Sequence, residues 1–196
     1  VAGLQAELHG AGLHRGDGLD AIGGLALVAD RISDIDALAS FARSATMYAY
    51  RRPRMISNPM IDLHGGRHPV VEAHVPPGDF VANDLRLEPG GVRFALITGP
   101  NMAGKSTVLR QTALITLMAH AGSFVPVEEA TIGICDRIFC RVGATDNIAR
   151  GESTFLVEMN ETSNILRNAT ADSVVIMDEV GRGTSTHDGL SIAWAV

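Results

Sequence analysis

The stretch Gly99-Pro-Asn-Met-Ala-Gly-Lys-Ser-Thr107 decides the fold of this chain. It fits G-x-x-x-x-G-K-[ST], the pattern of a loop whose backbone N–H groups cradle phosphates. The apolar run 92–98 predicts a buried strand that leads into the loop, and the sequence from 105 to about 120 predicts a helix that leaves it. A helix N-terminus carries unpaired N–H groups and a partial positive charge, so this arrangement favours phosphate binding over a plain strand-turn-helix connection.

Two side chains of this stretch have the chemistry that a nucleotide site needs. Lys105 would reach the outer phosphates, and the Ser106 hydroxyl is a candidate Mg²⁺ ligand. The sequence therefore predicts a nucleoside triphosphate together with Mg²⁺ at this site, and the family resemblance described below implies that the nucleotide is ATP or ADP.

A second element is the apolar run 173–178, which ends in two acidic residues. The end of a buried strand places Asp178 at the edge of the sheet, beside the phosphate loop, where it would hold Mg²⁺. Glu179 would orient and deprotonate the attacking water. An ordinary strand end with acidic residues is the alternative, and the pairing with the phosphate loop favours the catalytic interpretation. Lys105, Asp178 and Glu179 are the predicted catalytic residues.

Two polar segments add candidates. In 149–155, Ser153 and Thr154 stand at a predicted helix start. The free N–H groups there would bind a γ-phosphate of the same or a facing subunit. The alternative is that Ser153 is a plain N-cap. The segment 181–186 combines two glycines with three hydroxyl residues, which suits a tight turn at a phosphate site or a dimer contact. Arg150 and Arg182 are candidate cations, or solvated loop residues.

The composition is that of a globular protein. The 196 residues are 46% hydrophobic and 19% charged, with a net charge of −6, which argues against this segment as the main DNA-binding surface. No apolar run approaches the length of a membrane span. Cys135 and Cys140 are too few for a disulfide framework and fit reduced thiols in the cytoplasm. Because the chain starts at Val1 and ends inside a predicted helix without a cap, we expect an excerpt truncated at both ends.

Two regions are expected. Residues 1–52 predict a helical segment with an apolar stripe that packs on another helix, although glycines crowd the first 24 residues. Residues 53–196 predict an α/β domain with a largely parallel central sheet. The other expected strands are short: 68–75, 80–82, 85–87, 123–127, 131–134 and 137–142. A helix over 154–168 is expected after a polar loop.

Several motifs, in order, resemble the ATPase domain of the MutS family of DNA mismatch-recognition proteins. The resemblance covers about residues 60–196 and is carried by 67–72, 80–83, 99–107, 141–144, 152–159, 177–186 and 188–189. It implies an ABC-type ATPase fold with composite sites across a homodimer or heterodimer, and lever helices for residues 1–52. Ser153 would act in trans on the partner's nucleotide. Phe80 and Val81 would pack on the adenine, or belong to the core, and the remaining nucleotide contacts would come from Gly99, Pro100, Asn101, Met102, Ala103, Gly104, Lys105, Ser106 and Thr107.

The resemblance further implies a DNA-dependent ATPase that couples its nucleotide state to mismatched double-stranded DNA, bound through domains absent here, and to a MutL-like repair partner. It would act in the cytoplasm, at the nucleoid in a bacterium. A relative that binds branched or recombining DNA and a nucleotide-gated scaffold are the alternatives. Ala103 replaces a frequent family glycine and His187 an expected aromatic residue. Because later parts of the domain are missing, we expect the fragment alone to be weakly active or inactive.

Overall fold

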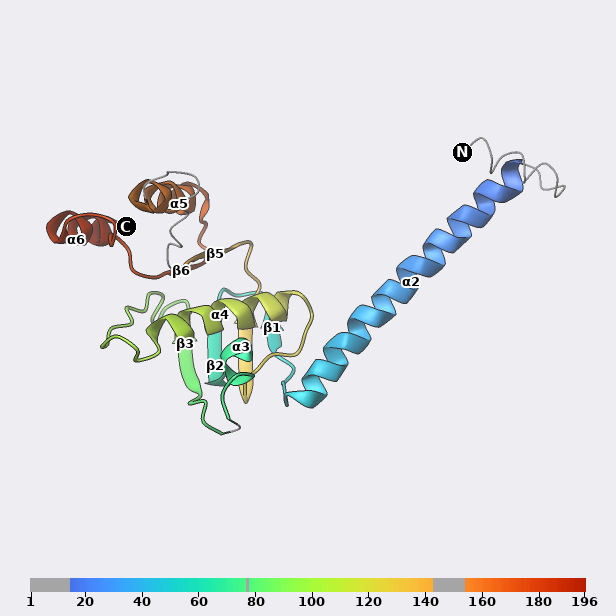
Figure 1. The fold of residues 1–196 in the computed structure, drawn as a ribbon, viewed down its shortest axis with the longest axis horizontal. Coiled ribbons are helices and arrows are strands. Elements are labelled where there is room, and N and C mark those ends of the chain that lie inside the picture. The colour runs from blue at the N-terminus through green and yellow to red at the C-terminus, as the bar shows by residue number, and fades with distance from the viewer. Residues whose placement is uncertain (1–14, 77, 143–153) are drawn as a thin grey trace. The chain divides into compact units, whose positions relative to one another are not determined.

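The computed structural model of the chain describes residues 15–76, 78–142 and 154–196. The chain divides into two units, the first ending at Ser44 and the second running from Ala45 to Val196. The long helix α2 (Arg15–Met47) supplies the described part of the first unit (Figure 1). Leu25, Val28, Ile32 and Ile35 of the predicted apolar stripe are each more than half exposed. The helical prediction is confirmed over Arg15–Met47, which includes the glycines from Gly16 onward; residues 1–14 lie outside the described residues.

A four-stranded sheet is the base of the second unit. It consists of β1 (Arg54–Ile56), β2 (Ile61–Gly66), β3 (Asn83–Leu87) and β4 (Glu129–Gly133), in the order β1-β4-β2-β3. Only β1 and β4 are parallel, whereas β2 pairs antiparallel with both β4 and β3. A separate parallel pair joins β5 (Ile138–Arg141) to β6 (Val174–Met177). The expectation of a largely parallel sheet was wrong in this respect: the β-structure is mixed, because β2 runs antiparallel to both of its neighbours.

Helix α4 (Lys105–His120) lies on one face of the four-stranded sheet, as Figure 1 shows. Ile115 and Ala119 pack against an apolar cluster from the strands and the segment after the helix: Ile61, Leu63, Val125, Val127, Ala130 and Ile132. The helix ends where predicted, because Gly122 adopts a φ of +81°. The N–H groups of Gly122 and Ser123 donate to the carbonyls of Ala119 and Met118, which caps the last turn.

Two more long helices follow in the chain. Helix α5 (Thr154–Asn168) has the predicted bounds, and its buried residues Glu158, Thr162 and Ile165 share one face by their spacing. Helix α6 (Thr186–Ala195) begins after Ser185, whose hydroxyl accepts the Asp188 N–H. No helix of the described residues is both long and apolar enough to cross a membrane.

Four expected strands are absent or much reduced. The run 68–75 instead holds the short helix α3 (Pro69–Glu72), because Pro69 suits a first helical position and His68 caps it. Residues 80–82 form no strand, and 123–127 contributes only a bridge between Val125 and Arg51. The run 92–98 is extended but pairs with no strand, and a strand exists only where a neighbour accepts its hydrogen bonds.

The cap of α3 makes folding sensitive to pH. His68 is buried, and its Nδ1 accepts the N–H groups of Val70 and Val71, at 3.3 Å each, so the ring must be neutral. Burial lowers the pKa of His68, and the nearby Arg110 lowers it further, below the ordinary value of about 6.5. As the pH falls, His68 therefore binds a proton in the unfolded chain before it does so in the folded chain. The stability that neutral His68 contributes at neutral pH is lost as the pH falls below about 6.5 toward the pKa of the folded state.

We expect His68→Asn to flatten this pH dependence, because an amide oxygen caps a helix without titrating. Urea unfolding of the two proteins at pH 7.5, 6.5 and 5.0 tests this. The difference in unfolding free energy between them should shrink or reverse as the pH falls. Parallel curves would exclude His68 as the titrating group.

Candidate functional site

The loop 99–104, the predicted phosphate cradle, leads into the first turn of α4. Gly104, the residue before the helix, has a φ of +87° and makes no side-chain cap hydrogen bond. Met102 also adopts a left-handed conformation, with a φ of 66°, whereas Ala103 does not, so its methyl group is tolerated. No acidic side chain lies in the first turn. The N–H groups at the start of α4 are thus left without a side-chain acceptor, as an anion site requires.

Lys105 is folded back on its own loop. Its Nζ donates to the carbonyl oxygens of Gly99 and Pro100, at 2.7 Å each. These two contacts keep the ammonium group against the backbone of the loop. Ser106 and Thr107 follow on the first turn of α4 and are half-buried.

The acidic residues follow β6. The N–H of Asp178 donates to the carbonyl of Arg141 at 2.8 Å, so the β5–β6 pairing extends to this residue. Glu179 then turns the chain with a φ of 53°. Non-glycine residues in this region are uncommon and are often found at functional sites. The Glu179 carboxylate forms an ion pair with Arg182, one turn later in the chain.

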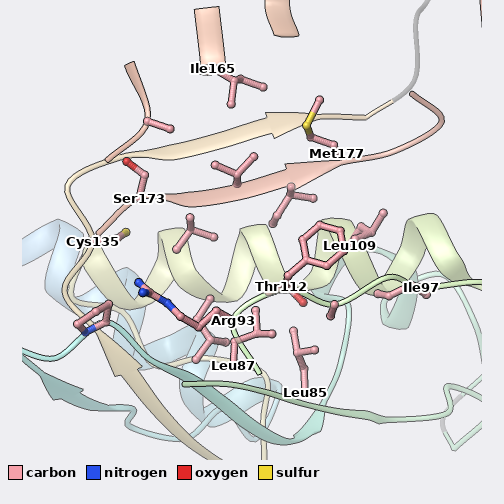
Figure 2. A pocket seen from close by; sticks show the side chains of 18 of the residues that line it. Leu85, Leu87, Arg93, Ile97, Leu109, Thr112, Cys135, Ile165, Ser173 and Met177 are labelled. Atoms are coloured by element: carbon pink, nitrogen blue, oxygen red, sulfur yellow. The ribbon is translucent and has the colours of Figure 1, made fainter. Parts of the chain in front are cut away.

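Lys105, Asp178 and Glu179 all line one cavity of about 730 Å³. Most of its wall is apolar and comes from the sheets, α4, α5 and the unpaired run 92–98. Figure 2 shows Leu85 and Leu87 from β3, Leu109 and Thr112 from α4, and Met177 from β6 around this space. Phe94 and Leu96 of the run 92–98 are 80% and 77% exposed, because they face this open space instead of a sheet.

Other predicted residues lie apart from the cavity lining. Ser106, Asn101 and Met102 are not among the lining residues, and Met102 is fully exposed. Phe80 is half-buried and Val81 is 80% exposed, and neither lines the cavity. Ser153 and Arg150 lie outside the described residues.

The available donors fit Mg²⁺ better than a metal held by protein ligands alone. Among the described residues no group of three or more His, Cys, Asp or Glu side chains is placed to hold a metal ion. Mg²⁺ keeps several waters and is usually bound by one or two protein oxygens plus substrate phosphates. The predicted ligands, the Ser106 hydroxyl and the Asp178 carboxylate, are such a limited set by their chemistry, and of the two only Asp178 lines the cavity. Cys135 and Cys140 are free thiols, and burial raises the pKa of both.

The prediction from sequence missed one set of residues beside the site. Arg141 of β5 and Glu158 of α5 are 6% and 3% exposed, and their side chains form an ion pair. Glu158 also accepts the N–H of Gly181, in the loop after Glu179. One sequence signal could have indicated these residues: Glu158 lies on the same helix face as Thr162 and Ile165. A charge on a buried helix face requires a partner.

Comparison with known proteins agrees with this architecture. The fold places the chain among mixed α/β proteins, and the family profile described as MutS domain V matches residues 95–196. The chain therefore belongs to the MutS family.

Individual relatives are closely similar over most of the chain. The DNA mismatch repair protein MutS of Treponema pallidum (strain Nichols) is 63% identical over 172 residues, which is 86% of this chain and 19% of that protein. The proteins of the same name from Syntrophobacter fumaroxidans and Myxococcus xanthus are 58% and 61% identical, over 89% and 86% of this chain and 20% and 19% of their own length. The chain spans about a fifth of the length of these relatives.

Proposed function

We propose that the chain is the ATP-binding and hydrolysing part of a MutS protein that recognises mismatched double-stranded DNA. One observation carries this proposal: the cavity that Lys105 lines beside the phosphate loop is also lined by Asp178 and Glu179. A phosphate-binding cation, a metal-binding carboxylate and a candidate base thus face a common space. The family membership supports the link to mismatch repair.

Each group of site residues has a separate role in the proposed transfer of the γ-phosphoryl group to water. The N–H groups of 99–107 and the ammonium group of Lys105 bind the phosphates and offset their charge. Bound Mg²⁺, held by Ser106 and Asp178, would supply electrostatic stabilisation of the transferred group. Glu179 accepts a proton from the attacking water as the water's oxygen bonds to the γ-phosphorus, and ADP leaves with the bridging oxygen. Phe80 and Val81 remain the proposed adenine contacts.

We further propose a dimeric assembly, homomeric or heteromeric, in which Ser153 of each subunit faces the nucleotide of its partner. The nucleotide state would control how other domains hold DNA, and a MutL-like partner would act on the signal. The protein would work in the cytoplasm. These assignments follow from the family and from the motif positions.

Binding to DNA in the presence of defined nucleotides tests the proposal. The full-length protein is measured by fluorescence anisotropy on one duplex with a single mismatch and on its matched counterpart, with ADP and then with ATP. We expect tighter binding to the mismatch with ADP, and sliding or release with ATP. Equal affinity for the two duplexes, or preference for a branched substrate, would overturn mismatch recognition and leave only the ATPase assignment.

A further inference from the structure

Glu158 is a buried carboxylate to which the proposed hydrolysis assigns no role. It lies on the second turn of α5 and is 3% exposed. Its Oε1 accepts the backbone N–H of Gly181, and its Oε2 lies 3.9 Å from Nη2 of Arg141. A buried charge is costly without partners, so the side chain is fixed by these two contacts.

Arg141 completes the arrangement from β5. Its Nε lies 2.7 Å from Oε2 of Glu161, which is half-exposed, so one buried guanidinium faces two carboxylates of α5. The carbonyl oxygen of Arg141 accepts the N–H of Asp178 at 2.8 Å. The backbone is therefore anchored just before Glu179, through Arg141, and two residues after it, through Glu158.

Close glycine contacts leave the same loop little freedom. A Cβ on Gly183 would lie 3.0 Å from the Cα of Phe155, in the first turn of α5. A Cβ on Gly181 would lie 2.5 Å from the carbonyl oxygen of Gly189, in α6. The loop after β6 is thus packed directly on two helices. Such surroundings are what a left-handed Glu179 requires, because an uncommon φ persists only where neighbouring structure holds it.

We propose that Glu158 is a positioning residue: through its hydrogen bond to Gly181 it fixes the backbone that aims the Glu179 carboxylate at the attacking water. The inference rests on the proposed function. It implies that the acceptor oxygen of Glu158 matters more than its charge. It also couples the start of α5 to the candidate base, since the two move as one packed unit.

Three substitutions separate the hydrogen bond from the charge. Glu158→Gln keeps an oxygen acceptor at the same reach, Glu158→Asp keeps the charge but withdraws the carboxylate by one methylene, and Glu158→Ala removes both. We expect kcat for ATP to fall about 10²-fold in Glu158→Ala, since a displacement of about 1 Å costs that much, and by less than about 10-fold in Glu158→Gln. Glu158→Asp should be slower than Glu158→Gln. KM and the stoichiometry of ATP binding should stay within about threefold, because the phosphate loop is untouched.

Glu161→Gln is the matched control. It removes the other carboxylate partner of Arg141 but makes no contact with the loop after β6, so kcat should change less than about twofold. A parallel fall of kcat and ATP-binding stoichiometry in the Glu158 variants would show a merely structural role and overturn the proposal. So would a Glu158→Asp enzyme at least as fast as Glu158→Gln, a comparison that remains informative when Glu158→Ala does not fold.

Amide hydrogen exchange separates this inference from the proposed function. The Gly181 amide should exchange faster in Glu158→Asp than in Glu158→Gln, whatever the reaction. With all variants made in the full-length protein, a wild type without ATP turnover contradicts the proposed function. Normal turnover that depends on Glu179, together with unchanged kcat in all Glu158 variants, contradicts only the positioning role.

Discussion

Replacing Glu179 with Gln is expected to reduce ATP hydrolysis by about 10³-fold and to leave the affinity for ATP within about threefold. Glutamine has the same length and suits the same backbone, but it cannot accept the proton of the attacking water. Nucleotide affinity comes instead from the phosphate loop and Lys105, which the substitution does not touch. Single-turnover hydrolysis of radiolabelled ATP, beside equilibrium binding of a non-hydrolysable analogue, measures the two quantities separately.

Asp172→Asn is the matched control for this experiment. Asp172 also lines the cavity, but it precedes β6, whereas Glu179 follows the other end of the strand. Asp172→Asn removes one negative charge from the cavity wall, as Glu179→Gln does, but it should leave the rate of hydrolysis within about twofold of the wild type. Hydrolysis that survives Glu179→Gln would remove the general base from the proposal. A nucleotide-gated scaffold would then account better for the site.

The largest effect on stability is expected for Gly133→Ala. Gly133 ends β4, and its N–H donates to the carbonyl of Met60 at 2.7 Å. An added Cβ would overlap the Asn58 carbonyl oxygen and lie 2.5 Å from the Met60 nitrogen. These atoms belong to the backbone that joins β1 to β2, so they cannot rotate away as a side chain can. We expect a loss of about 3 kcal/mol or more of unfolding free energy.

Gly122→Ala isolates the effect of contact from that of conformation. Gly122 has a φ of +81°, but a Cβ there would meet nothing within 4 Å. Only the left-handed conformation is penalised, which costs about 1 kcal/mol. Urea denaturation of both variants against the wild type gives the comparison. Equal losses would mean that the β1–β2 connection adapts to the methyl group.

The sequence predicted the elements with strong local signals. Helix α4 has the predicted bounds because the positive-φ glycines Gly104 and Gly122 stand next to its ends, and α5 shows the predicted periodic face. The run 92–98 has the composition of a buried strand, yet it forms no ladder. Strand formation depends on which edge is available, and that is set by residues far away in the chain. Strand β2 was not among the expected strands, and its antiparallel pairing with both neighbours was not predicted either.

The candidate site residues also fall into two groups: those with a local sequence signal and those that depend on contacts between distant segments. Lys105, Asp178 and Glu179 were proposed from pattern alone, because each follows a recognisable element, and all three line the cavity. The pairing of Arg141 with Glu158, and of Glu158 with Gly181, joins three segments that are distant in sequence. No local pattern encodes such a contact. A polar residue on a buried helix face indicates that a partner exists but does not identify it.

Because Lys105 already contacts its own loop, a bound nucleotide has to replace these hydrogen bonds with its own. Two hydrogen bonds to carbonyl oxygens must break before the ammonium group can turn to a ligand. A nucleoside has nothing to offer in return, whereas a chain of phosphates replaces both contacts with stronger, charge-assisted ones. We therefore expect this loop to select polyphosphates over nucleosides, independently of any contact with the base.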